Sequence, residues 1–126
     1  MSVPDRPSAP MVHVIAGAMT AAQARDAVTV GIDEAARRGA PLLLDIREAT
    51  IAAFAYRDAF AIARAFADAA DGYPHRVAVL DHYDDAFLVT QFFEASTAVR
   101  GLDVKAFVDE GDARGWLSGR ELSPAA

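Results

Sequence analysis

Residues 41–46 read PLLLDI, a short apolar run without the polar alternation of a half-buried strand. Residues 75–81 read HRVAVLD and contain a second run of the same type. Continuous apolar runs of this length are typical of strands that are buried on both faces, as in the parallel sheets of α/β proteins. The two runs therefore predict a sheet that is covered by helices.

The segment before the first run predicts a strand and a helix. The strand is MVHVIAG, at residues 11–17. Thr20 and Gln23 have the spacing of a capping box, in which a hydroxyl and an amide each bond to a backbone N–H at the start of a helix. The helix that they open is expected to run to Arg38 and to end at Gly39, because glycine is the residue best tolerated in a left-handed cap.

The same alternation continues along the rest of the chain. Residues 54–72 predict a second helix, and a third is expected to be capped by Asp84 and closed by Gly101. The last strand, DVKAFVD at 103–109, ends in Asp109, which is expected to cap a short final helix. The predicted fold is therefore an α/β domain in β-α-β-α-β-α-β-α order, with a parallel or mixed sheet of about four strands flanked by helices.

Length and composition fit one small domain. The chain has 126 residues, 53% of them hydrophobic, and no cysteine, which excludes disulfides and cysteine-based metal sites. We expect the domain at 11–119, after a disordered lead-in at 1–10 and before a flexible tail at 120–126. No secretory signal is evident, and no apolar run approaches the roughly 20 residues that span a bilayer. We therefore expect a cytoplasmic protein without a membrane span.

Charge and motifs exclude several classes of function. The net charge is −6, and the 12 basic residues are dispersed among 18 acidic ones, so nucleic-acid binding is disfavoured. The glycines form neither a dinucleotide-binding fingerprint nor a Walker loop, and His13 and His75 belong to no metal-binding motif. We expect no cofactor.

Three aspartates stand at the ends of predicted strands, namely Asp45, Asp81 and Asp109. Ligands of open α/β sheets bind at the carboxyl ends of the strands, so these carboxylates are candidates for a Mg²⁺ site. The accompanying phosphatase and receiver-domain motifs are missing, however, since Asp45 is followed by Ile-Arg instead of x-Asp. Aspartate is also common at strand ends because it starts turns and caps helices, and this structural interpretation is preferred.

His82 and Tyr83 follow the strand that ends in Asp81. Histidine in this position is a candidate general base, and tyrosine a candidate acid or oxyanion donor. No nucleophile elbow and no cysteine accompany them, which favours a loop histidine that is bonded to backbone.

The second helix is rich in aromatic residues, with Phe54, Tyr56, Phe60 and Phe66 within or at the start of it. These side chains either form the main core of the domain or line a pocket or docking surface for an apolar partner. The core interpretation is preferred, and Phe54 and Tyr56 are the members that we expect to be exposed.

RVAVLD at 76–81 and RGLDVKAFVDEGDARGWLSG at 100–119 resemble the closing part of SpoIIAA-like (STAS-like) bacterial proteins. That part has a strand, a helix, a v-x-v-F strand and then x-x-x-A-x-x-W-L. AGAMTAAQARDAV at 16–28 and LLLDIRE at 42–48 also resemble the opening of the family. The matching positions in the closing part are Val104, Phe107, Asp109, Ala113, Trp116 and Leu117.

The resemblance implies a compact domain with a mixed sheet. Members of the STAS type act as anti-sigma-factor antagonists that are switched by phosphorylation of a serine in D-S-S-G. The corresponding region here, ATIAAFAYRD at 49–58, contains no serine, so the switch is not carried over. Simpler relatives have been likened to CRAL-TRIO lipid-binding domains, which favours an apolar ligand by analogy of fold.

These observations together predict a non-catalytic regulatory or binding domain for a partner protein or a small apolar ligand. A symmetric homodimer is a further expectation. The alternative is a small Mg²⁺-dependent hydrolase or phosphoryl-transfer enzyme that uses the strand-end carboxylates and His82. The residues expected to bind the ligand or partner are Phe54, Tyr56, Arg57, His82 and Tyr83.

Overall fold

The computed structural model describes residues 9–51, 55–82 and 87–119, in which strands and helices alternate in the predicted order. The lead-in up to residue 8, the tail at 120–126 and the predicted helix cap Asp84 lie outside the described residues. The elements are β1 (Met11–Met19), α1 (Ala21–Arg38), β2 (Leu42–Ile51), α2 (Tyr56–Ala69), β3 (Val77–Leu80), α3 (Phe87–Ala98), β4 (Val104–Phe107) and α4 (Glu110–Leu117).

The four strands form one sheet in the order β1-β2-β3-β4, and every pairing between neighbours is parallel. The predicted α/β class and element order are confirmed. The mixed sheet that the family resemblance implied is wrong for the described strands. Each strand is followed by a helix that returns the chain to the end of the sheet where the next strand starts, and this connection produces parallel pairs.

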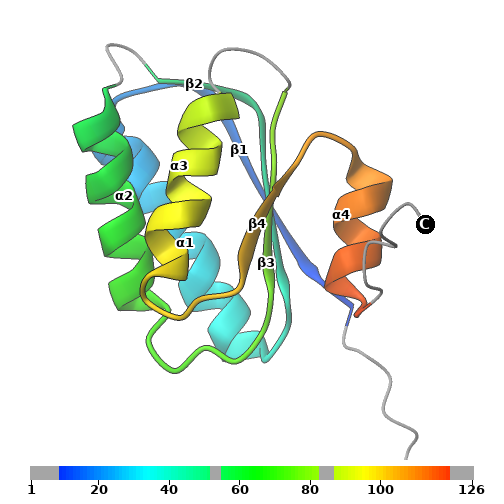
Figure 1. Cartoon of the computed structure of the whole chain (residues 1–126). Coiled ribbons are helices and arrows are strands. Elements are labelled where there is room, and N and C mark those ends of the chain that lie inside the picture. The colour runs from blue at the N-terminus through cyan, green and yellow to red at the C-terminus, as the bar shows by residue number, and fades with distance from the viewer. Residues whose placement is uncertain (1–8, 52–54, 83–86, 120–126) are drawn as a thin grey trace, which may run out of the picture.

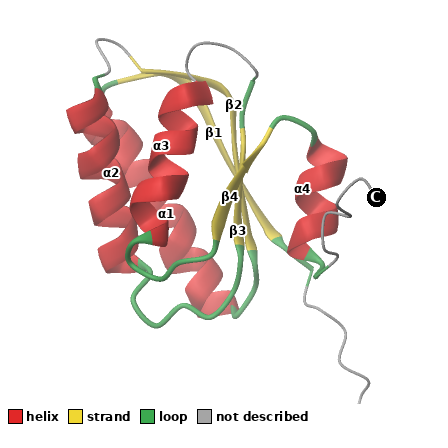
Figure 2. Cartoon of the chain, in the orientation of Figure 1, coloured by secondary structure: helices red, strands yellow, loops and turns green. Residues whose placement is uncertain are grey.

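The helices lie in two layers of unequal size (Figures 1 and 2). Helices α1, α2 and α3 cover one face of the sheet, here called the helix face, and α4 alone packs on the opposite α4 face. Helix α4 contacts β2, β3 and β4. None of the helices in the described ranges is long and apolar enough to cross a membrane.

Helix α1 has the predicted termini. The Gln23 N–H donates to Thr20 Oγ1 at 3.1 Å, and the Thr20 N–H donates to Gln23 Oε1 at 2.9 Å, which completes the capping box. The helix ends at Gly39, whose φ of 63° is left-handed and therefore suits glycine. The buried stripe toward the sheet is Ala24, Val28, Ile32 and Ala35.

Strand β2 is longer than predicted, because it continues from Ile46 to Ile51 alongside β1. The register between the two strands shifts after Val14, where Ile15 of β1 lies opposite two residues of β2, Ile46 and Arg47. Such a bulge bends a strand, and Gly17, with a φ of 97°, supplies a backbone conformation that other residues rarely adopt. The ends of β1 and β2 consequently bend over the helix layer (Figure 1).

Candidate functional site

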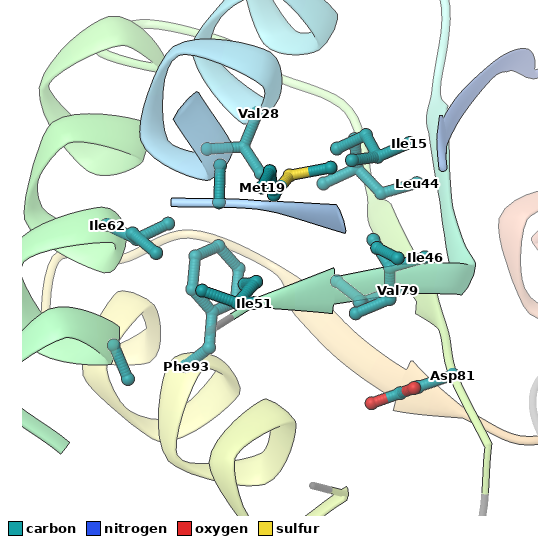
Figure 3. A pocket seen from close by; sticks show the side chains of 13 residues that line it. Ile15, Met19, Val28, Leu44, Ile46, Ile51, Ile62, Val79, Asp81 and Phe93 are labelled. Atoms are coloured by element: carbon teal, nitrogen blue, oxygen red, sulfur yellow. The ribbon is translucent and has the colours of Figure 1, made fainter. Parts of the chain in front are cut away.

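A cavity of about 190 Å³ lies between the sheet and the three helices of the helix face. Residues from the bent ends of β1 and β2 line it, at the carboxyl edge of the sheet where ligands of α/β proteins bind (Figure 3). Its described lining is apolar except for one side chain. The lining residues are Ile15, Met19, Ala24, Val28, Leu44, Ile46, Ala49, Ile51, Ala59, Ile62, Val79, Asp81 and Phe93.

The cavity exists because small side chains face it from several elements. Ala24 of α1 and Ala59 of α2 are almost fully buried but are too short to reach across the space. The lining residues Ala49 and Ile51, from the end of β2, and Met19, from the end of β1, are here called the roof of the cavity. Figure 3 shows Met19 and Ile51 among the lining side chains. The bend thus moves apolar residues away from the plane of the sheet and leaves a gap that the helices do not fill.

Asp81 is the one charged residue in the described lining and is only 7% exposed. Its backbone is fixed beyond the end of β3, where the Asp81 N–H donates to the Phe107 carbonyl at 2.9 Å. Its carboxylate accepts a hydrogen bond from the His82 backbone N–H, with 2.7 Å between Oδ1 and the nitrogen. The carboxylate lies on the cavity side of β3, near Val79 (Figure 3).

The two other strand-end aspartates do not join Asp81. Asp45 lies on the α4 face, where both of its carboxylate oxygens accept hydrogen bonds from the Arg47 guanidinium, at 3.0 and 2.8 Å. Asp109 caps α4 by accepting from the Asp112 N–H at 2.9 Å. Within the described ranges, no group of three acids or histidines could hold a metal ion, so the proposed Mg²⁺ site receives no support from the geometry.

An ion-pair network gives Asp45 a structural role. The side-chain hydrogen bonds from Arg47 hold the pKa of Asp45 below its usual value of 3.8. Arg47 also reaches Glu110 of α4, with 3.2 Å between Nη2 and Oε1. The pKa of Glu110 is lowered first by Arg114 and then by Arg47. The network ties the end of β2 to α4 and leaves no evident role for Asp45 in chemistry.

The predicted binding residues fall on separate elements. Tyr56, 57% exposed, and Arg57 begin α2, whereas His82 is exposed just after β3. None of these three belongs to the described lining of the cavity. Phe54 and Tyr83 lie outside the described residues. The exposure expected for Tyr56 is confirmed.

A second hollow, here called the α2–α3 groove, lies on the outer surface of the helix layer. Its floor includes the buried residues Ala63 and Ala67 of α2. Phe60, 54% exposed, and Val99, 86% exposed, flank the floor. The rest of its lining is Arg64, Ala95, Ser96 and Arg100.

Sequence reasoning missed most of the cavity. The roof residues Ala49 and Ile51 lie beyond Ile46, at which the predicted strand ends. The alternation in ATI, at 49–51, was the available signal that a strand with one buried face continues there. No protein-family model, no curated protein and no solved structure matches this chain.

Proposed function

We propose that this chain is a non-catalytic binding domain of SpoIIAA-like type that holds a small apolar ligand in the cavity of the helix face. The observation that carries the proposal is the 190 Å³ cavity itself, with an apolar lining at the carboxyl edge of a parallel sheet. A natural core of this size packs closely and rarely leaves such a void.

The volume limits the size of the ligand. An apolar cavity of about 150 Å³ in another protein binds benzene, so by proportion this cavity holds roughly seven to eight heavy atoms. A single ring with one substituent, or a short branched alkyl group, has this size. A complete long-chain lipid does not, although a longer molecule can place its end in the cavity.

Toluene is a direct probe of this function. Burying about seven carbons at about 0.8 kcal/mol each gives roughly 5 kcal/mol, which corresponds to a dissociation constant of about 0.1–1 mM. We expect toluene to bind in this range and to perturb the NMR methyl signals of Ile15, Ile62 and Val79.

A matched pair of variants on α2 locates the binding. Ala59 is 2% exposed and lines the cavity, whereas Ala61 is exposed on the same helix. Ala59→Leu is expected to fill the cavity and to abolish toluene binding, and Ala61→Leu to leave it unchanged. The proposal is wrong if the unmodified protein does not bind toluene or if both variants bind it equally.

A second candidate function is self-association through the α2–α3 groove. Phe60 and Val99 present apolar area there, beside Arg64 and the ion pair of Arg100 with Asp68, whose atoms are 2.8 Å apart. A patch with an apolar centre and both signs of charge can meet itself across a two-fold axis. We expect light scattering to show a dimer that Phe60→Arg dissociates. Val30→Arg, at an exposed valine of α1 outside the groove, is the control. A monomer at millimolar concentration contradicts this candidate.

A further inference from the structure

The two edge strands of the sheet differ in how well they are protected from pairing with another chain. Strand β4, at one edge, has four residues, includes Lys105, and has its Ala106 N–H bound to the Glu94 carboxylate at 2.7 Å. Short length, a lysine and a covering side chain each keep a sheet edge from pairing. Strand β1, at the other edge, has nine residues and contains no lysine, arginine, acid or proline. The bulge after Val14 bends its second half, so the straight part at residues 11–14 stays open to a further strand.

The straight part of β1 directs backbone groups away from the sheet. Within the described ranges β1 pairs only with β2, and on that side the Met11 N–H donates to the Pro41 carbonyl at 2.8 Å. Successive residues of a strand turn their backbone groups to opposite edges, so the N–H and C=O groups of Val12 and Val14 point away from β2. A row of such groups is a template for one more strand.

The side chains of these two valines set the chemistry of the partner. Val12 is 41% exposed and Val14 is 58% exposed. Side chains alternate along a strand and Ile15 packs in the core of the helix face, so both valines lie on the α4 face, where α4 contacts the other three strands. An added strand would place its own side chains beside them, and pairs of β-branched side chains stabilise such a contact. The matching segment is therefore uncharged and has β-branched apolar residues at every second position.

A flexible segment fits this edge better than a second copy of the chain does. In two copies related by a two-fold axis, the straight start of one β1 would lie beside the bent end of the other, so the two folded strands would diverge after a few residues. An extended peptide has no fixed bend and can follow β1 along its length.

We propose that β1 is a docking edge for an extended peptide segment of another protein, which adds one strand to the sheet and places β-branched side chains beside Val12 and Val14. This inference depends neither on a ligand in the cavity nor on the α2–α3 groove. Because backbone hydrogen bonds hold such a segment, the edge recognises the alternating apolar pattern of the peptide more than any single sequence.

The probe is a blocked heptapeptide in which valine and threonine alternate between two terminal lysines. Its threonine nitrogens are methylated, so only the edge that carries the valine N–H groups can pair, and the peptide cannot assemble into sheets by itself. Amide hydrogen exchange measured by NMR is the readout. We expect saturating peptide to slow exchange at the Val12 and Val14 N–H groups at least about tenfold, while the Met11 N–H, already bound to Pro41, is unchanged. A control peptide with the valine nitrogens also methylated is expected to have no effect.

A matched pair of variants locates the peptide. Val14→Lys removes an apolar contact and places a charge on the edge, so it is expected to weaken peptide binding at least about tenfold. Val30→Lys makes the same change at a valine of α1 that is also 58% exposed, and it is expected to leave binding unchanged. Circular dichroism verifies the fold of both variants, and the exchange measurement on the unmodified protein stands without them.

Three results would overturn the proposal. The first is exchange at Val12 and Val14 that the peptide does not slow. The second is equal weakening by Val14→Lys and Val30→Lys, or loss of peptide binding in Ala59→Leu, which would place the peptide in the cavity. The third is protection of Val12 and Val14 that is present without peptide and grows with protein concentration, because a second copy would then cover the edge.

Discussion

The two faces of the sheet are filled in opposite ways. On the α4 face, one helix of eight residues closes a compact cluster. Trp116 packs on Phe107 with ring centroids 5.6 Å apart, and the Arg76 guanidinium lies 4.8 Å from the centre of the Trp116 ring. On the helix face, three longer helices leave a cavity against the sheet. Close packing here depends on the volume of the side chains that meet the sheet, and the number of helices does not decide it.

The largest expected loss of stability comes from truncating a large side chain in the core of the α4 face. Trp116→Ala is expected to lower the free energy of unfolding by about 3–5 kcal/mol, because it removes the largest side chain of this cluster and leaves a new void. Ile62→Ala, at the wall of the existing cavity, is expected to cost only about 2 kcal/mol, since Ile62 already lacks neighbours on one side. Urea denaturation measures both. Equal losses would contradict the difference in packing between the faces.

Enlarging one alanine side chain on each face of the sheet tests the same difference in packing. Ala113 of α4 is fully buried, so Ala113→Leu overpacks this position. The substitution is expected to lower the free energy of unfolding by about 1–3 kcal/mol. Ala59→Leu makes the same change beside the cavity and is expected to alter the free energy of unfolding by less than about 1 kcal/mol. A large loss in both variants would show that the cavity cannot accept a side chain, and by implication a ligand of this shape.

A smaller effect is expected at the close approach of α1 to β1. A Cβ added at Gly31 would lie 2.8 Å from His13 Cδ2, while the His13 ring is held by a 3.0 Å hydrogen bond between Nε2 and the Ala27 carbonyl oxygen. Gly31→Ala is therefore expected to lose about 1 kcal/mol, because the clash exceeds the gain of about 1 kcal/mol in helix propensity. In a double-mutant cycle, Gly31→Ala is expected to be no longer destabilising when His13 is also replaced by alanine. Stabilisation by Gly31→Ala alone would show that His13 moves aside without cost.

Local patterns allowed the fold to be predicted. The capping box of Thr20 and Gln23, the Asp109 cap and the buried runs of β2 and β3 are each specified by a few neighbouring residues. The bend of β1 and β2 depends instead on a bulge between strands that are distant in sequence. No local pattern reports such a pairing, so the bend that places Ala49 and Ile51 at the cavity could not be predicted in the same way, although the alternation at 49–51 indicates that the strand continues.

The strand-end aspartates show why the candidate site was harder to predict than the fold. Side chains alternate between the faces of a strand. Leu44 packs in the core of the helix face and Asp45 follows it, so Asp45 points to the α4 face. Asp81 is two residues beyond Val79, another residue of that core, and points to the cavity. The sequence predicts that Asp45 and Asp81 lie at the carboxyl edge of the sheet. Which face of the sheet each side chain lies on follows only once the faces of the neighbouring residues are known.

The smallest expected effect concerns the polar rim of the α4 face. Arg47 lowers the pKa of Asp45 in the folded protein, so the stabilisation is fully present above the ordinary value of 3.8 and is lost as pH falls through the lower folded value. Arg47 is about one-third exposed, and solvent screening keeps the contribution of this pair to stability small. Arg47→Met is expected to show a small loss of stability at pH 7 and a smaller loss at pH 3 in urea denaturation. Arg25→Met, at an exposed residue with a looser 3.8 Å contact to Asp26, is the control. A loss that does not change with pH would mean that Arg47 acts through packing of its aliphatic stem. Side-chain volume would then stabilise the polar rim of the α4 face as well as its core.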